Sequence, residues 1–94
     1  LEQRTDQGTG QTITSSAGVT TVSFNSPFFV GTSALGNLNQ HLPTVNVTAQ
    51  NLASGDFFEI SNITASNFQI HFKNSSNASI SKQFTFTAVG FGKG

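Results

Sequence analysis

Residues 62–92 read NITASNFQIHFKNSSNASISKQFTFTAVGFG, and this stretch decides the fold class. Each half of it places an apolar side chain at every second position: Phe68, Ile70 and Phe72, then Phe84, Phe86 and Ala88. A period of two is typical of a strand with one buried face. The tract KNSSNASIS at residues 73–81 lies between the halves, and its Asn and Ser side chains favour turns. The stretch therefore predicts two strands, which form either a hairpin or two strands of one sandwich.

Four shorter runs of the same kind precede this stretch, at residues 11–15, 19–24, 43–50 and 56–63. In the last of them the inward face is open to two interpretations, Phe58 with Ile60 or Phe57 with Ile63. Gly, Ser and Asn separate the runs, and no helical periodicity is present. The whole pattern predicts an all-β protein, a six-stranded antiparallel β-sandwich.

The remaining segments carry no alternation. Residues 1–10 hold three of the eight charged side chains and are expected to be a linker or the end of an upstream element, so that residues 11–94 form the domain. Residues 28–42 make a connection longer than most. This connection either folds its apolar residues back onto the sandwich or forms a binding surface.

Composition limits what the domain can do. Four Lys and Arg balance four Asp and Glu among 94 residues, so the chain lacks the basic footprint that nucleic-acid binding needs. No apolar run reaches the length of a membrane-spanning helix, so we expect no membrane insertion. A chain that begins with Leu is expected to be a piece of a longer protein. Only 35% of the residues are apolar, so we expect a thin core for which the ten Phe compensate in part. Without Cys no disulfide can support it, so oligomerisation would.

The sequence offers no catalytic or metal-binding pattern. His41 and His71 are the only histidines, and they lack ligand-like spacing. Asp56 and Glu59 could pair as an acid and a base, but no nucleophile or cofactor loop accompanies them. We therefore expect no enzyme and no cofactor. The four Asn-x-Ser/Thr motifs are interpreted as chance matches in a chain rich in these residues, at Asn46, Asn62, Asn74 and Asn77.

Four short stretches together resemble the H-type lectin domain: VSFNSPF, PTVNVTAQNL, ISNITASNFQIHFKN and FTFTAVGFG. The closing AVGFG is also similar to the C-terminal tip domains of bacteriophage tail fibres. The resemblance covers residues 20–92. It implies a six-stranded antiparallel sandwich that assembles as a parallel homotrimer.

The resemblance does not extend to the residues with which the family binds sugars. Glu59 stands where the lectins carry an Arg, and residues 73–77 replace an aromatic pair. Asn67 replaces a Gly, a change that Asn tolerates because it accepts left-handed conformations. The resemblance thus implies the scaffold and not the lectin site.

From the scaffold we expect the receptor-binding C-terminal domain of a phage tail fibre, located in the virion. Its partner would be a bacterial surface glycan, such as lipopolysaccharide, or an outer-membrane protein. Two alternatives are a secreted H-type lectin that binds sugars like N-acetylgalactosamine, and a purely structural trimerisation or capping domain.

Two loops are the candidate receptor contacts, because binding residues concentrate on loops held by a rigid scaffold. The first loop and the strand before it carry amide, hydroxyl, imidazole and ammonium groups, which can pair with sugar hydroxyls. These residues are His71, Lys73, Asn74, Ser75, Ser76 and Asn77. The second loop offers Asn37, Asn39, Gln40 and His41.

Overall fold

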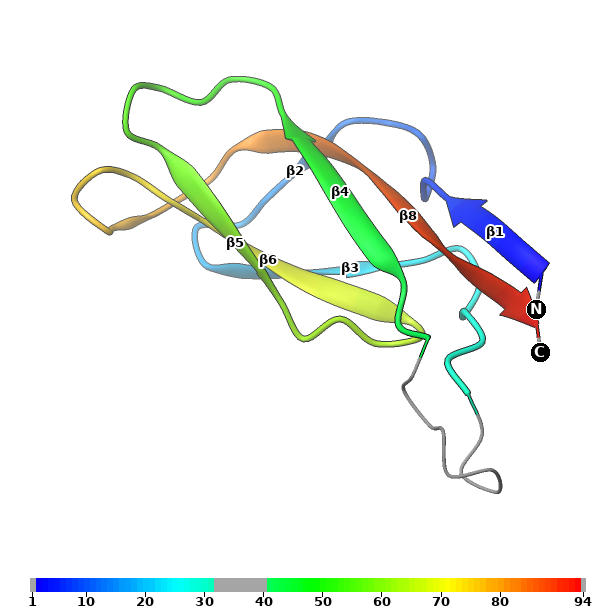
Figure 1. The fold of residues 1–94 in the computed structure, drawn as a ribbon. Coiled ribbons are helices and arrows are strands. Elements are labelled where there is room, and N and C mark those ends of the chain that lie inside the picture. The colour runs from blue at the N-terminus through cyan, green and yellow to red at the C-terminus, as the bar shows by residue number, and fades with distance from the viewer. Residues whose placement is uncertain (1, 32–40, 94) are drawn as a thin grey trace.

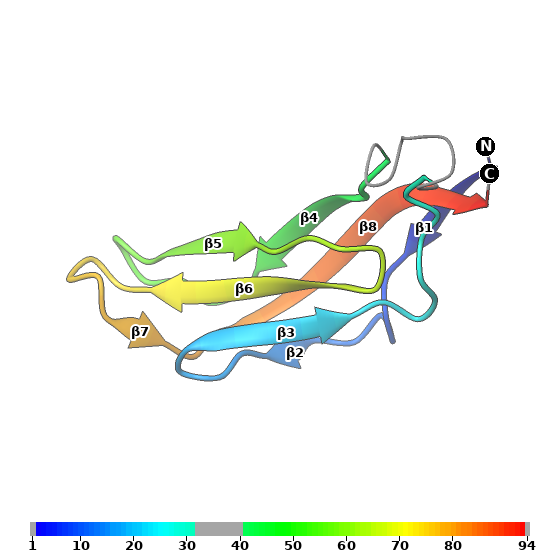
Figure 2. The same ribbon diagram turned by 90° about the horizontal axis from the view of Figure 1, so that it is seen from below.

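The structure is a computed structural model, and it describes residues 2–31 and 41–93. These residues form two antiparallel sheets and contain no helix. The sheets lie face to face in an elongated body of 45 × 25 × 17 Å (Figures 1 and 2). The predicted all-β class and its antiparallel sheets are confirmed.

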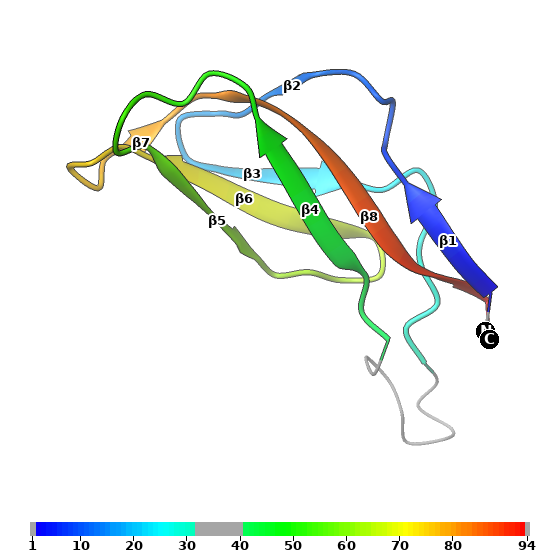
Figure 3. The ribbon, with the colours of Figure 1, turned by 45° about the horizontal axis from the view of Figure 1, so that its top comes forward.

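The first sheet is built around β8, which is the longest strand. β8 (Gln83–Lys93) pairs with β4 along one side, and with β1 and β2 along the other. The bounds of these partners are β1 Glu2–Asp6, β2 Ile13–Thr14 and β4 Thr44–Ala49. Figure 3 shows this sheet from its outer face.

The second sheet is built around β6 (Asn67–Lys73), which lies between β3 and β5. Its other strands are β3 Val19–Ser23, β5 Phe57–Ser61 and the short β7 Ser79–Ile80, which pairs with the end of β6. Two of the strands in the structure, β1 and β7, lie outside the runs that the alternation predicted.

The core forms where β6 and β8 face each other. The six side chains that alternate in residues 62–92 are all buried, as predicted: Phe68, Ile70, Phe72, Phe84, Phe86 and Ala88. The rings of Phe72 and Phe84 approach to 5.6 Å between centroids. Because β6 and β8 belong to different sheets, the hairpin interpretation is wrong and the sandwich interpretation is right.

The register of β5 on β6 resolves which face of β5 is buried. Phe58 pairs with Phe72 and Ile60 with Ile70, so Phe58 and Ile60 point into the sandwich. Phe57 points outward and remains 40% exposed. Ile63, beyond the strand, also packs against the core.

Residues 2–6, for which we expected a linker or the end of an upstream element, form a strand of the first sheet. β1 pairs with β8 from Glu2 to Asp6. The carboxylate of Asp6 is buried, and it accepts hydrogen bonds from the backbone N–H groups of Gly8 and Asn25 at 2.8 Å each. Arg4 forms an ion pair with it at 3.2 Å. A buried carboxylate with several partners ties this segment firmly to the sandwich.

The long connection after β3 returns its first apolar residues to the core. Phe28 and Val30 are buried, and Phe29 bridges to Phe91 of β8. For these residues the folded-back interpretation is confirmed. Asn37, Asn39 and Gln40 of the second candidate loop lie outside the described residues.

Candidate functional site

The first candidate loop, residues 74–78, forms a tight turn between β6 and β7, and we call it the distal tip. The side-chain oxygen of Asn74 accepts hydrogen bonds from the backbone N–H of Ser76 at 2.9 Å and of Ala78 at 3.0 Å. Asn77 adopts a φ of 64°, which Asn tolerates better than most residues. The Asn74 oxygen therefore organises the loop from within, while Ser75, Ser76 and Asn77 are exposed.

The distal tip is braced by the turn between β4 and β5. Gly55 has a φ of 88°, and a Cβ placed on it would lie only 2.7 Å from the Cβ of Ser75. Position 55 therefore requires glycine for two reasons, the positive φ and the close approach of Ser75. The two loops make one end of the molecule (Figure 1).

His71 and Lys73 lie beside the distal tip, on the outer face of the second sheet. Lys73 Nζ is 2.8 Å from Glu59 Oε1 on β5, and His71 Nε2 is 2.7 Å from Ser79 Oγ. The hydrogen bond and charge of Lys73, followed by the charge of His71, lower the pKa of Glu59 below its usual value. Together with Glu59 and Ser79, His71 and Lys73 make up the polar surface beside the distal tip, and the exposed ring of Phe57, which pairs with Lys73, borders it.

His41 is the described residue of the second candidate loop, and it occupies a different place. Its backbone N–H donates to the carbonyl of Val30 at 3.2 Å. Its ring stacks on Phe29 at 6.3 Å and meets Phe91 edge-on at 5.4 Å. Because Phe91 lies in the last part of β8, His41 is near the end of the molecule opposite the distal tip (Figure 1). The structure does not bring His41 together with the residues of the first candidate loop.

Asp56 and Glu59 do not face each other as an acid and a base. Asp56 pairs with Lys82 at 3.3 Å and accepts the backbone N–H of Ala53 at 2.8 Å. Glu59 pairs instead with Lys73. Within residues 2–31 and 41–93, no group of three or more metal-ligating side chains gathers, and no helix is long and apolar enough to cross a membrane.

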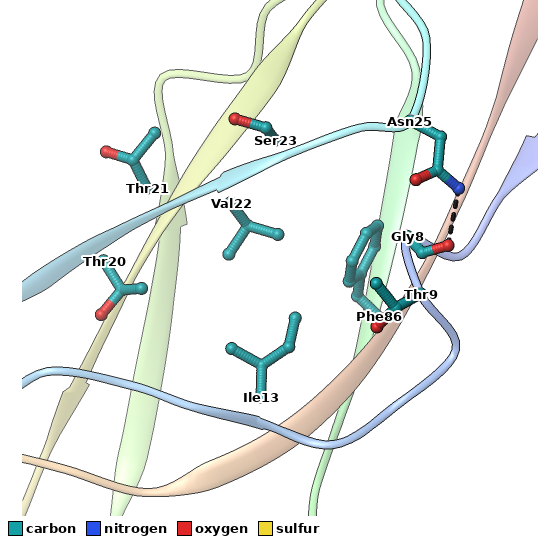
Figure 4. A pocket seen from close by; sticks show the side chains of 9 residues that line it. All are labelled: Gly8, Thr9, Ile13, Thr20, Thr21, Val22, Ser23, Asn25 and Phe86. Carbon is teal, nitrogen blue, oxygen red and sulfur yellow. Dashed lines mark hydrogen bonds between the residues drawn. The ribbon is translucent and has the colours of Figure 1, made fainter.

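A pocket of about 280 Å³, which no sequence pattern predicts, lies at the edge of the sandwich (Figure 4). The side chains of Ile13 and Val22 point toward each other across it, and the ring of Phe86 closes one end. The other lining residues are Gly8, Thr9, Thr20, Thr21, Ser23 and Asn25. Its lining comes from three separate segments, none with a motif, so only the fold reveals it.

No family model, curated protein or solved structure matches this chain.

Proposed function

We propose that this domain is the receptor-binding module at the end of a bacteriophage tail fibre, and that it works as a homotrimer of H-type-lectin-like sandwiches. It would recognise a bacterial surface glycan or an outer-membrane protein through the distal tip and the polar surface beside it, without catalysis.

The observation that carries this proposal is the position of the distal tip relative to the chain ends. Glu2 pairs with Lys93, so both ends of the described chain lie side by side at one end of the long axis. The distal tip lies at the other end (Figure 1). A domain attached to a longer protein through either end would therefore point the tip away from its anchor.

The chemistry of the tip suits a polar partner. Exposed hydroxyl and amide groups of Ser75, Ser76 and Asn77 are held by an ordered loop, which reduces the entropy lost on binding. The chain contains no Trp or Tyr to serve as a stacking platform, so we expect each single site to be weak. Several copies on one axis would raise the avidity through effective concentration.

The outer face of the first sheet supports assembly of copies. Its cross-strand pairs between β4 and β8 are all uncharged: Thr44 with Val89, Asn46 with Thr87 and Thr48 with Thr85. Interface cores are depleted of charged residues, and a flat strand face without charge suits burial against another copy. The second sheet, by contrast, carries Glu59, His71 and Lys73 on its outer face.

The uncharged face also favours a second candidate, a structural trimerisation or capping domain. Such a domain would assemble in the same way and bind no receptor. The two candidates differ in whether the distal tip contacts anything.

The decisive experiment measures binding of the purified protein to susceptible bacterial cells. The test variant combines Ser76→Ala with Asn77→Gly, because Gly accepts the positive φ at position 77 and keeps the loop shape. We expect at least about a tenfold loss of binding, with unchanged assembly. The control is Gln11→Ala, an exposed polar residue outside the tip. A parent protein that assembles but binds neither cells nor their glycans would favour the structural candidate.

A further inference from the structure

The pocket at the sandwich edge opens beside an unpaired edge of β3. Among the described residues, β3 pairs with β6 alone, and its other side faces the mouth of the pocket. The N–H of Phe24 donates to the carbonyl of Ser66 at 3.0 Å. Phe24 and Ser66 come directly after the pair of Ser23 with Asn67, so they are a hydrogen-bonded pair of the ladder. Hydrogen-bonded and non-bonded pairs alternate in an antiparallel ladder. It follows that Thr21 and Ser23 direct their backbone N–H and C=O groups away from β6, toward the free edge.

The polar side chains around the pocket are already engaged with the protein. Thr20 Oγ1 accepts the N–H of Ser16 at 2.9 Å, and Asn25 Nδ2 donates to the carbonyl of Gly8 at 2.6 Å. Thr9 Oγ1 accepts the N–H of Gln11 at 3.3 Å. The backbone groups of Thr21 and Ser23 on the free edge are therefore the regular row of hydrogen-bonding groups at the mouth. A sugar is recognised mainly by side-chain amides, carboxylates and stacked rings; here no carboxylate, Trp or Tyr lines the pocket, and the amide nitrogen of Asn25 is already bonded to Gly8.

No charged side chain lines the pocket. Its apolar side chains are those of Ile13, Val22 and Phe86, and none of its lining residues is ionisable. Its volume of about 280 Å³ exceeds the roughly 150 Å³ that holds a benzene molecule in a protein interior. One aliphatic or aromatic side chain therefore fits.

The edge of β3 also lacks the usual protection against pairing. Exposed edge strands are commonly guarded by charged residues or Pro. β1 carries Glu2, Arg4 and Asp6, and β5 carries Glu59, whereas β3 reads VTTVS. Of the free edges in the described structure, that of β3 combines an unguarded backbone with a pocket beside it.

We propose that β3 and this pocket bind an extended, uncharged segment of a partner protein, which adds a strand to the second sheet and places one apolar side chain in the pocket. Backbone hydrogen bonds to Thr21 and Ser23 would provide affinity. The pocket would select the side chain. This site lies apart from the distal tip and does not depend on the function proposed for the tip.

The test uses the whole chain and a blocked peptide of four Thr around one central Leu, with the same peptide carrying central Gly as its control. Amide hydrogen exchange and chemical shifts are followed by NMR. We expect the Leu peptide to slow exchange at Thr21 and Ser23 by at least about tenfold, and the Gly peptide to leave it unchanged. No protection at either amide with millimolar Leu peptide would overturn the proposal.

Two protein variants separate the edge from the pocket. Thr21→Pro removes the backbone N–H that position 21 directs to the free edge, a place where an edge strand tolerates Pro. Thr21→Ala is the matched control, because it changes the same side chain and keeps the N–H. Ile13→Phe fills the pocket with a larger side chain. We expect Thr21→Pro and Ile13→Phe each to weaken peptide binding by about tenfold, and Thr21→Ala to leave it unchanged. Should Thr21→Pro fail to fold, Ile13→Phe still decides the role of the pocket.

Two further outcomes would also overturn the proposal. Protection of Thr21 and Ser23 that rises with protein concentration, without peptide, would make a second copy the occupant. Shifts at the pocket residues caused by N-acetylglucosamine, and not by the Leu peptide, would make the ligand a sugar.

Discussion

The rings of Phe68 and Phe86 meet edge to face between the two sheets, with centroids 5.2 Å apart and planes at 65°. Phe68 belongs to β6 and Phe86 to β8, and this contact joins the central strands of both sheets. T-shaped aromatic pairs add to the stabilisation from buried area alone. Together with the contact between Phe72 and Phe84, this pair holds the two sheets together through their central strands.

Replacing Phe86 with Ala should destabilise the protein strongly. The side chain is 5% exposed, and removing a buried Phe costs about 3–5 kcal/mol. That is a large share of the roughly 5–15 kcal/mol that stabilises a typical domain. Urea unfolding measures the change. Phe57→Ala, at an exposed Phe, is the control and should cost about 1 kcal/mol or less. A free energy of unfolding of Phe86→Ala close to the parent's would contradict this assignment of the core.

The order of the distal tip should depend on the side-chain oxygen of Asn74. Asn74→Ala leaves the N–H groups of Ser76 and Ala78 without their acceptor. Asn74→Asp keeps a side-chain oxygen that can accept from both. We expect faster amide exchange at these two positions in Asn74→Ala and near-parent exchange in Asn74→Asp. Equal exchange in both variants would show that the backbone alone holds the turn.

Glu59 should titrate below its usual pKa of 4.5, because Lys73 donates to its carboxylate and His71 adds positive charge nearby. A folded-state pKa below the unfolded one means that the interaction stabilises the folded state above about pH 4.5, and that this contribution is lost as the pH falls through the folded pKa. The carboxylate is exposed, so the effect on melting should be small. NMR titration measures the pKa directly. Lys73→Gln should move it back up, and an unchanged value would disprove the ion pair.

Charge on the outer face of the first sheet should prevent assembly. Thr87→Lys places an ammonium group at the centre of the uncharged face formed by β4 and β8. We expect light scattering at micromolar concentration to give a trimer for the parent and a single chain for this variant, because an unpaired buried charge is costly. Ser61→Lys, on the exposed outer side of β5, should remain trimeric. A parent protein that has the mass of one chain would remove the trimer altogether.

Alternation predicted the strands that line the core, because one face of each must be buried. It missed β1, which reads EQRTD, since an edge strand paired only with β8 buries little side chain and needs no apolar period. It also left β6 and β8 open to a hairpin, because sequence neighbours often pair. Only the pairing of β4, β1 and β2 with β8 excludes that arrangement.

The candidate site was predictable where its residues were contiguous. Asn and Ser between two strands indicated the distal tip. Glu59, the ion-pair partner of Lys73, comes from another strand, and only the register of β5 on β6 places it there. The pocket beside β3 has no counterpart in any local pattern, since Gly8, Ile13, Val22 and Phe86 meet only after both sheets have formed.

The adjacency of Glu2 and Lys93 has a mechanical consequence. A pull applied between the two chain ends would peel β1 from β8 one pair at a time, and such unzipping requires little force. A pull between the chain ends and the distal tip runs along β8, whose hydrogen bonds to β1, β2 and β4 lie across that direction and must shear together. A domain anchored through its ends and held at its tip is thus loaded along its strongest direction, and would withstand the drag on an attached particle far better than its thin core suggests.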